Sequence, residues 1–371
     1  MRRIPTGRGG RKRGDRNTGV LVTLAQPATI HSSISPGWAE VIGHTWAAHV
    51  LHNAIRHGHV GHAYLLTGPE QVGKTMLARI FAQALNCAAD DISVRPCGMC
   101  RACRLIAQDR HPDVILMTPE VSGRGKPSYK IEAIRQLQQA LQLAPYEGRY
   151  KVAILRRFDT ANPNAANAFL KTLEEPPERV ILLLTALEAE ALLETVRSRC
   201  RILALRPLPT DLIEQLLRER RQLPPDQAAL LAHLAQGRPG WAIAAAQEPG
   251  RLATRQAHLN ALRQALQGKR VARFQLAAQL AEQAETLPDL LETWLSWWRD
   301  VLLLANGAAA AAITNVDLTQ ELTALARRWT PDGARAHLHD TQTALWQLDH
   351  NANTLLVLEN LFLRYPSSSE G

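Results

Sequence analysis

The sequence predicts an α/β fold: a parallel sheet with helices on both faces, followed by a small helical lid and a C-terminal all-α bundle. In the first half of the chain, short aliphatic runs alternate with amphipathic segments, which is typical of this class. After Pro207 and Pro209 the aliphatic runs stop, and Leu/Ala periodicity of the helical kind continues to about residue 364. The two patterns predict two kinds of architecture within one chain.

Near-continuous runs of Val, Ile and Leu predict strands that are buried on both faces of the sheet. The expected strands cover residues 63–67, 113–117, 151–155, 180–184 and 201–205. Helices are expected between them, because apolar residues recur there at helical spacing. One such face holds Ile131, Ile134, Leu137 and Leu141, and another holds Ala166, Phe169, Leu170 and Leu173.

The regions that follow from these patterns are a basic tail (1–30), an α/β core (31–206), a helical lid (207–248), a helical bundle (249–366) and a short second tail (367–371). Gly/Pro-rich and Gly/Ala-rich breaks at 237–240 and 306–312 interrupt the helical half. The bundle contains Trp294, Trp297 and Trp298 at i, i+3, i+4 spacing. Aromatic residues at this spacing predict a packing surface rather than a cofactor site.

Positive charge is concentrated at the start of the chain. Residues 1–16 contain seven Arg/Lys and one Asp, which is +6 of the formal +9 and leaves +3 for the remaining residues. This composition predicts a disordered tail that either contacts nucleic acid or is a plain solvated extension. The chain has no apolar run of about 18–20 residues, the length a membrane span needs. We expect neither a signal peptide nor a membrane partner, and therefore a cytoplasmic protein.

Residues 68–75 match the phosphate-binding pattern G-x-x-x-x-G-K-[ST], the P-loop, in full. They are Gly68, Pro69, Glu70, Gln71, Val72, Gly73, Lys74 and Thr75. The expected strand 63–67 precedes them and an expected helix (76–85) follows, which is the context that the motif requires. Backbone N–H groups and the helix N-terminus would hold phosphate oxygens, Lys74 would neutralise charge and Thr75 would ligate Mg²⁺. The motif predicts ATP/Mg²⁺ binding, with a vestigial loop kept for folding as the alternative.

Hydrolysis of ATP also needs a carboxylate at the end of a neighbouring strand, to hold Mg²⁺ and position the attacking water. The expected strand 151–155 is followed instead by Arg156 and Arg157. Arginine stays protonated and cannot ligate a cation or act as a base. Asp159 comes later and is expected at a helix N-terminus. We therefore expect nucleotide binding without hydrolysis, and no independent catalysis by this chain.

Four of the five cysteines lie close together in the sequence. Cys87, Cys97, Cys100 and Cys103 give the spacing C-x9-C-x2-C-x2-C. Two C-x2-C steps bring three thiolates together, and the fourth closes a tetrahedral site for structural Zn²⁺. Because all four positions are filled by protein, a catalytic zinc with an open position is not expected. An iron–sulfur cluster could use the same ligands.

Several segments resemble the AAA+ clamp-loader subunits of bacterial DNA replication, over residues 36–246. Besides the P-loop and the cysteine knuckle, the likeness rests on residues 38–44, expected beside an adenine, and on residues 62–66, 111–113, 145–148, 170–177 and 198–200. In this family the arginine of the Ser-Arg-Cys element reaches the ATP of a neighbouring subunit. The resemblance implies that Arg199 is a catalytic arginine finger acting in trans. An ordinary surface arginine paired with an acid is the alternative.

The family contains an ATP-hydrolysing motor, gamma/tau, and a delta-prime kind of subunit. The motor has acids where this chain has Arg156 and Arg157, and a lid arginine that we align with Gly240. The chain therefore resembles the delta-prime kind, which belongs to the DNA polymerase III holoenzyme, a DNA-directed DNA polymerase. The implied partners are gamma/tau and delta subunits, the sliding clamp and primer-template DNA, and the bundle would form the collar that holds the ring together. A gamma/tau-type motor and a stand-alone AAA+ DNA repair or recombination protein are the alternatives.

A short basic stretch is a further candidate for contact with the DNA backbone. It consists of Arg124, Lys126, Lys130 and Arg135, before and within the expected helix 131–143. A solvated helix face explains the same residues equally well.

Overall fold

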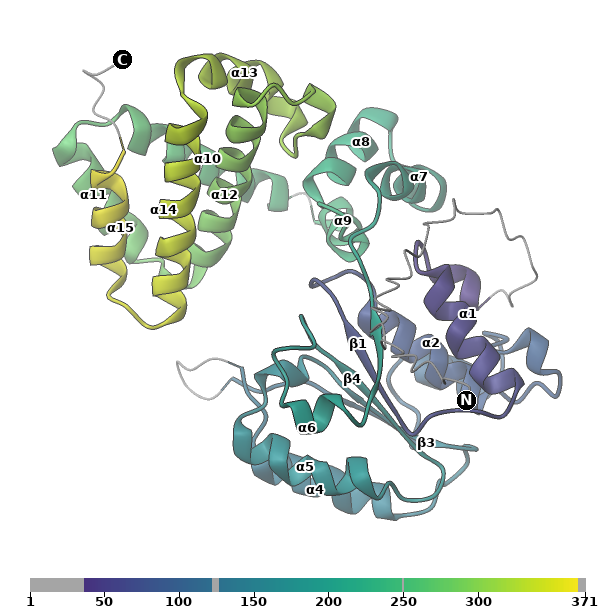
Figure 1. Cartoon of the computed structure of the whole chain (residues 1–371). Coiled ribbons are helices and arrows are strands. Elements are labelled where there is room, and N and C mark those ends of the chain that lie inside the picture. The colour runs from purple at the N-terminus through teal and green to yellow at the C-terminus, as the bar shows by residue number, and fades with distance from the viewer. Residues whose placement is uncertain (1–36, 122–126, 249, 366–371) are drawn as a thin grey trace, which may run out of the picture. The chain divides into compact units, whose positions relative to one another are not determined.

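The computed structural model describes residues 37–121, 127–248 and 250–365 (Figure 1). The tails predicted at 1–30 and 367–371, together with the basic residues Arg124 and Lys126, lie outside the described residues. Among the helices that are described, none is long and apolar enough to cross a membrane.

A five-stranded parallel sheet with the order β2-β3-β4-β1-β5 forms the centre of the core. Its strands are β1 (Ala63–Thr67), β2 (Val114–Met117), β3 (Lys151–Leu155), β4 (Val180–Thr185) and β5 (Arg201–Ala204). All five predicted strands are confirmed, with ends that differ by at most one residue. Because the strands are parallel, each connection crosses the sheet, and the carboxyl ends of all strands meet at one edge.

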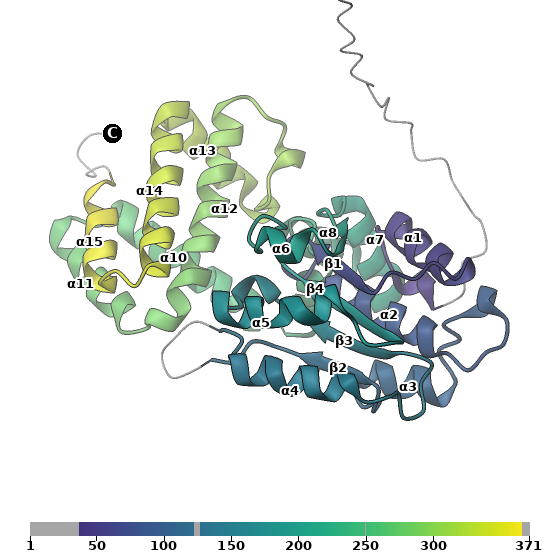
Figure 2. The same cartoon turned by 60° about the horizontal axis from the view of Figure 1, so that its bottom comes forward.

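Alternate residues of the strands face two separate hydrophobic cores. On one face, Tyr64, Leu66 and Ile154 pack with helices α1 (Thr45–Arg56), α2 (Lys74–Asn86) and α3 (Arg101–Ala107). On the other face, Leu65 and Leu155 pack with α4 (Ile131–Gln142), α5 (Pro163–Glu174) and α6 (Glu194–Arg197). Figures 1 and 2 show α1 and α2 on one side of the sheet and α4 and α5 on the other. The helical faces predicted for α4 and α5 are those that the core buries.

No strand occurs after β5 in the described part of the chain, as predicted. Helices α7 (Thr210–Arg221), α8 (Pro225–Leu234) and α9 (Pro239–Gln247) form the lid around a small core that includes Ile213, Leu217 and Leu231. The bundle consists of α10 (Gly250–Gln267), α11 (Arg270–Ala281), α12 (Leu287–Ala305), α13 (Thr319–Arg328), α14 (Pro331–Asp349) and α15 (Thr354–Leu363). Short 3-10 helices occupy Trp38–Glu40, Ile92–Val94, Phe158–Thr160, Ala284–Thr286, Ala310–Ala312 and Val316–Leu318.

The tryptophans of α12 form the centre of the bundle. Trp294, Trp297 and Trp298 are each at most 1% exposed. The ring of Trp298 lies edge-on to Trp329, with ring centroids 5.4 Å apart. Aromatic rings buried in this way stabilise the bundle mainly through the apolar area that they remove from water. The predicted packing role is confirmed.

Candidate nucleotide and metal sites

The P-loop connects β1 to α2 at the carboxyl edge of the sheet. Gly68 has φ +133° and Gly73 has φ +115°, backbone conformations that side chains disfavour. A Cβ on Gly68 would also collide with the carbonyl of Leu205. Glu70 to Thr75 line a cavity of about 630 Å³ between the core and the lid. The volume lies within the range of about 300–1,000 Å³ that is typical of ligand pockets.

Lys74 is the buried cation of this loop. Its Nζ donates hydrogen bonds to the carbonyl of Gly68 at 2.5 Å and to that of Pro69 at 2.7 Å. Burial lowers the pKa of Lys74 to about 8, and the nearby Glu70 carboxylate opposes that shift. The ammonium group therefore lies beneath the loop, with loop carbonyls in the place that phosphate oxygens would take. Gly68 and Pro69 are not themselves part of the cavity wall.

The lid contacts the P-loop through backbone atoms. The N–H of Gly240, in the first turn of α9, donates to the carbonyl of Gln71 at 2.9 Å. A Cβ on Gly240 would lie 2.9 Å from that oxygen and 3.1 Å from the Cβ of Gln71, closer than such atoms normally approach. The position that we aligned with the lid arginine of the motor therefore lies directly against the P-loop and has no room for a side chain.

Arginines occupy the end of β3, where a hydrolase needs acids. Both Arg156 and Arg157 line the cavity. Arg157 has φ +50°, and its N–H donates to Oγ1 of Thr185, at the end of β4, at 3.0 Å. Its guanidinium forms an ion pair with Glu70 of the P-loop. The side chain therefore bridges from the end of β3 to the phosphate-binding loop.

Asp159 lies in the first turn of the short 3-10 helix Phe158–Thr160. Its carboxylate accepts a hydrogen bond from Nε of Arg157 at 3.0 Å, and its side chain is only 7% exposed. It is not among the residues that line the cavity. The nearest acid after β3 is thus already neutralised within the chain.

Two further arginines of the cavity come from the lid. Arg220 and Arg221, in the last turn of α7, line its wall, and Nη2 of Arg220 donates to the carbonyl of Ala39 at 2.9 Å. Sequence reasoning missed both, because no motif marks them and only the docking of the lid brings them to the P-loop. Of the segment expected beside an adenine, Glu40 and Ile42 line the cavity. Trp38 does not; it is buried and donates to the carbonyl of Arg95 at 2.9 Å.

The four cysteines come together as one cluster. The Sγ atoms of Cys87, Cys97, Cys100 and Cys103 all lie within 4.8 Å of one another, and none forms a disulfide. The N–H groups of Cys97, Cys100 and Cys103 each donate to the preceding sulfur of the cluster at 3.4 Å. The N–H of Cys100 is the main cause that lowers the pKa of Cys97 to about 6. Four sulfurs this close fit a tetrahedral Zn²⁺ with Zn–S distances of about 2.3 Å.

Buried polar residues connect this cluster to the sheet. Asp113 accepts hydrogen bonds from the N–H groups of Tyr146, Glu147 and Gly148 at 2.6, 2.9 and 2.7 Å. Burial alone would raise the pKa of Asp113, but these three donors lower it. Asn86, next to Cys87, exchanges two hydrogen bonds with the backbone of Tyr150. Segments 111–113 and 145–148 thus have a structural role beside the cysteine cluster.

Arg199 lies in the turn between α6 and β5 and is not part of the cavity in its own chain. Its Nη2 is 2.5 Å from Oε1 of Glu174, at the end of α5, and its Nη1 donates to the carbonyl of Thr195 at 2.7 Å. The side chain is 34% exposed. Segments 170–177 and 198–200 therefore meet at this ion pair.

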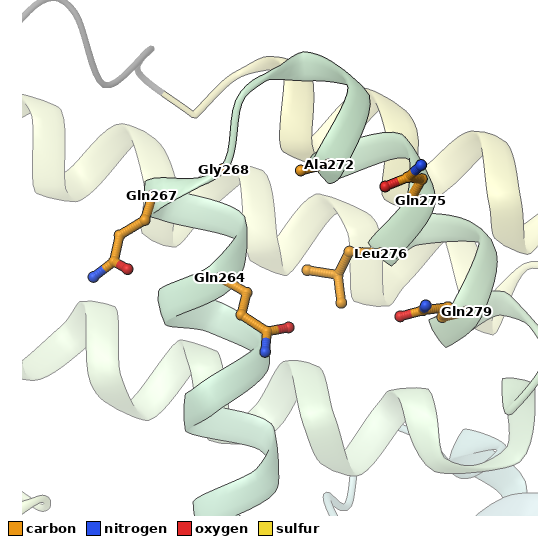
Figure 3. A pocket seen from close by; sticks show the side chains of 7 residues that line it. All are labelled: Gln264, Gln267, Gly268, Ala272, Gln275, Leu276 and Gln279. Atoms are coloured by element: carbon orange, nitrogen blue, oxygen red, sulfur yellow. The ribbon is translucent and has the colours of Figure 1, made fainter.

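A second cavity lies in the bundle between α10 and α11 (Figure 3). Glutamine amides surround it: Gln264, Gln267, Gln275 and Gln279 line it together with Gly268, Ala272 and Leu276. It contains no ionisable side chain, so it offers neither a general base nor a nucleophile.

Two family profiles match most of the chain. The family described as "DNA polymerase III, delta subunit" matches residues 43–209, and "DNA polymerase III, delta subunit, C terminal" matches residues 249–366. The tau subunit of DNA polymerase III from Escherichia coli is 37% identical over 205 residues, which cover 54% of this chain and 31% of that protein. Both profiles describe DNA polymerase III subunits, and together with this relative they support an AAA+ clamp-loader family for the chain.

A second DNA polymerase III subunit is similar over a comparable length. The gamma/tau subunit from Mycobacterium tuberculosis is 34% identical over 180 residues, 48% of this chain and 30% of that protein. The chain thus spans less than a third of the length of these two relatives. A solved gamma subunit-related protein from Thermotoga maritima is 16% identical, with a TM-score of 0.41, and the match covers 82% of this chain and 94% of that one. So distant a likeness says nothing about function.

Proposed function

We propose that this chain is a non-hydrolysing, delta-prime-like subunit of the DNA polymerase III clamp loader. The observation that carries the proposal is the pair Arg156 and Arg157 at the end of β3, in the wall of the P-loop cavity. Without a free carboxylate there, no group holds Mg²⁺ or positions a water, so bound ATP is not turned over. The absence of any side chain at Gly240 supports the same conclusion, because the lid offers no cation there to sense a γ-phosphate.

In this proposal the chain supplies Arg199 to the ATP site of a neighbouring subunit. The arginine is outside its own cavity and partly exposed, so it is free to contribute in trans. An arginine finger stabilises charge on the transferring phosphoryl group and is worth about 10³–10⁵ in rate. The ion pair with Glu174 is exposed, and such pairs contribute only about 0–1 kcal/mol. An incoming phosphate can therefore replace the carboxylate at little cost.

The remaining parts of the proposal concern partners and cofactors. The chain works in the cytoplasm with gamma/tau and delta subunits, and the bundle (249–366) joins a collar that holds the ring together. The assembly uses ATP to load the sliding clamp on primer-template DNA. The four cysteines hold structural Zn²⁺, and the P-loop holds ATP without hydrolysis.

The second candidate is a gamma/tau-type motor, because the curated relatives with the matches described above carry that name. The two candidates differ in one property that is simple to measure. Steady ATP hydrolysis by the purified chain would support the motor. It would contradict the inference, drawn from the arginines after β3, that bound ATP is not hydrolysed. No turnover above a blank, with the fold confirmed by circular dichroism, is the expected result.

Reconstitution tests the trans role. The full chain is mixed with gamma/tau and delta, and assembly is followed on a sizing column before DNA-stimulated ATPase and clamp loading are measured. Arg199→Ala is expected to assemble normally and to slow turnover at the adjacent site by about 10³-fold or more. Arg179→Ala, an exposed arginine that precedes β4, is the matched control and should have no effect. Unchanged ATPase in Arg199→Ala would remove the proposed role.

A further inference from the structure

The arginines of the P-loop cavity have a consequence for the ligand, and not only for its hydrolysis. A P-loop ordinarily binds its nucleotide together with Mg²⁺, which is held by the loop hydroxyl, here Thr75, and by a carboxylate from a neighbouring strand. Magnesium requires oxygen ligands in near-octahedral geometry, and carboxylates provide its protein contacts. The fit of this cavity to Mg²⁺ can therefore be judged from its carboxylates.

Arg157 neutralises the two carboxylates closest to the P-loop and the end of β3. Its guanidinium contacts Glu70 and Asp159 at the same time. Asp159 lies outside the cavity wall, and among the described residues that line the cavity Glu40, from the segment before α1, is the one acid besides Glu70. A fixed guanidinium also repels a divalent cation, most strongly where water is partly excluded. The side chains around Thr75 do not fit Mg²⁺.

The same residues fit a polyanion. The cavity wall contains five cations, Lys74, Arg156, Arg157, Arg220 and Arg221, against the two acids Glu40 and Glu70, an excess of three positive charges. Arg156 is exposed and makes no ion pair with another residue of the described ranges. Guanidinium groups bind phosphate oxygens in a bidentate manner, with stronger hydrogen bonds than neutral donors make. Together these cations can balance most of the charge of a triphosphate that carries no metal.

The cavity is not lined by charge alone. Ile42, Leu216 and Ile243 contribute apolar surface to the same wall. Ligand sites commonly combine an apolar lining with a few polar groups that fix orientation. Apolar surface of this kind fits the nucleoside of ATP. Inorganic triphosphate has no nucleoside and cannot use this surface.

We propose that the P-loop cavity binds a nucleoside triphosphate as its metal-free anion, with Arg156 and Arg157 in the place of magnesium. The inference rests on the proposed function in one respect, namely that the bound nucleotide is not hydrolysed. In ordinary P-loop proteins Mg²⁺ supports nucleotide binding, and here we expect binding that does not need it. Chelation of Mg²⁺ should leave ATP affinity unchanged or increase it, because free ATP carries two more negative charges than its magnesium complex.

The test is calorimetric titration of the full chain with ATP, in excess Mg²⁺ and in EDTA. The dissociation constant in EDTA is expected to equal or fall below that in Mg²⁺. Arg156→Gln should weaken binding in EDTA by about tenfold, the loss of one charge-assisted contact. Lys74→Ala should abolish saturable binding, which would locate it at the P-loop. The matched control is Arg110→Gln, an exposed arginine before β2, which should bind ATP as the unmodified chain does.

Inorganic triphosphate tests the nucleoside part and should bind at least about tenfold more weakly than ATP. Equal binding of the two would overturn that part. Binding that requires Mg²⁺, or no saturable binding in either buffer, would overturn the metal-free site. Magnesium-dependent binding without hydrolysis would refute only the metal-free site. ATP hydrolysis by the chain would refute the proposed function.

Discussion

The contact between lid and P-loop predicts that Gly240 tolerates no side chain. In Gly240→Ala the added Cβ would lie 2.9 Å from the carbonyl oxygen of Gln71 and 3.1 Å from its Cβ. Neither atom is the end of a flexible side chain, so the first turn of α9 must move away from the P-loop. That movement lengthens the hydrogen bond from the residue-240 N–H to Gln71, now 2.9 Å.

The magnitude follows from three contributions. Overpacking in a closely packed contact costs about 1–3 kcal/mol. Weakening one backbone hydrogen bond costs about 1 kcal/mol. Alanine is favoured over glycine within a helix by about 1 kcal/mol, which offsets part of this loss. We expect the free energy of lid opening to fall by about 1–3 kcal/mol.

Hydrogen exchange of the amides in α9 and the P-loop measures this directly. A loss of 1.4 kcal/mol in the opening free energy corresponds to about tenfold faster exchange. Gly250→Ala, at the start of α10, is the matched control, because a Cβ there meets nothing within 4 Å. It should be neutral or slightly stabilising. Protection in Gly240→Ala equal to or greater than that of the unmodified chain would refute the reasoning.

Three further predictions concern the cysteine cluster, the residues next to it and α4. Zinc analysis should find one ion per chain, lost in Cys103→Ser but retained in Cys200→Ser, which lies outside the cluster; iron or no metal would contradict this. Asp113→Asn should lower the free energy of unfolding by about 2–4 kcal/mol at neutral pH, because it weakens charge-assisted hydrogen bonds from three N–H groups. Because the folded-state pKa of Asp113 is lowered, its contribution is present above the unfolded value of about 3.9 and is lost as pH falls through the folded value. The difference from Asp113→Asn in pH-dependent denaturation should therefore shrink below about pH 4; a constant difference would argue against an ionised carboxylate. If α4 contacts DNA, Lys130→Gln with Arg135→Gln should reduce the salt slope of loader–DNA binding by about 2; an unchanged slope would assign both residues to a solvated face.

The sequence predicted the centre of the sheet well because β1, β3 and β4 are buried at every position. Runs such as 151–155 and 180–185 are buried at every position, so their hydrophobicity alone marks them. The P-loop and the cysteine cluster were also visible, because their ligand atoms come from residues close together in the chain. In each of these cases the chemistry is encoded over a short distance.

What the sequence did not reveal depends on contacts between distant segments. Arg220 reaches the P-loop cavity only because the lid docks on the core through Gly240 and Gln71. The ion pair between Arg199 and Glu174 likewise joins two motifs that lie apart in the sequence. No local pattern predicts such pairs, since their geometry is set by the packing of whole helices.

Helix α2 connects the P-loop directly to the cysteine cluster. It begins at Lys74 of the P-loop and ends at Asn86, immediately before Cys87, so one uninterrupted rod about 20 Å long joins the two ends. The rod crosses the interior of the core, where Leu77, Phe81 and Leu85 are almost wholly inaccessible to water. The buried side of the helix thus holds the P-loop and the cysteine cluster at a fixed separation within the core.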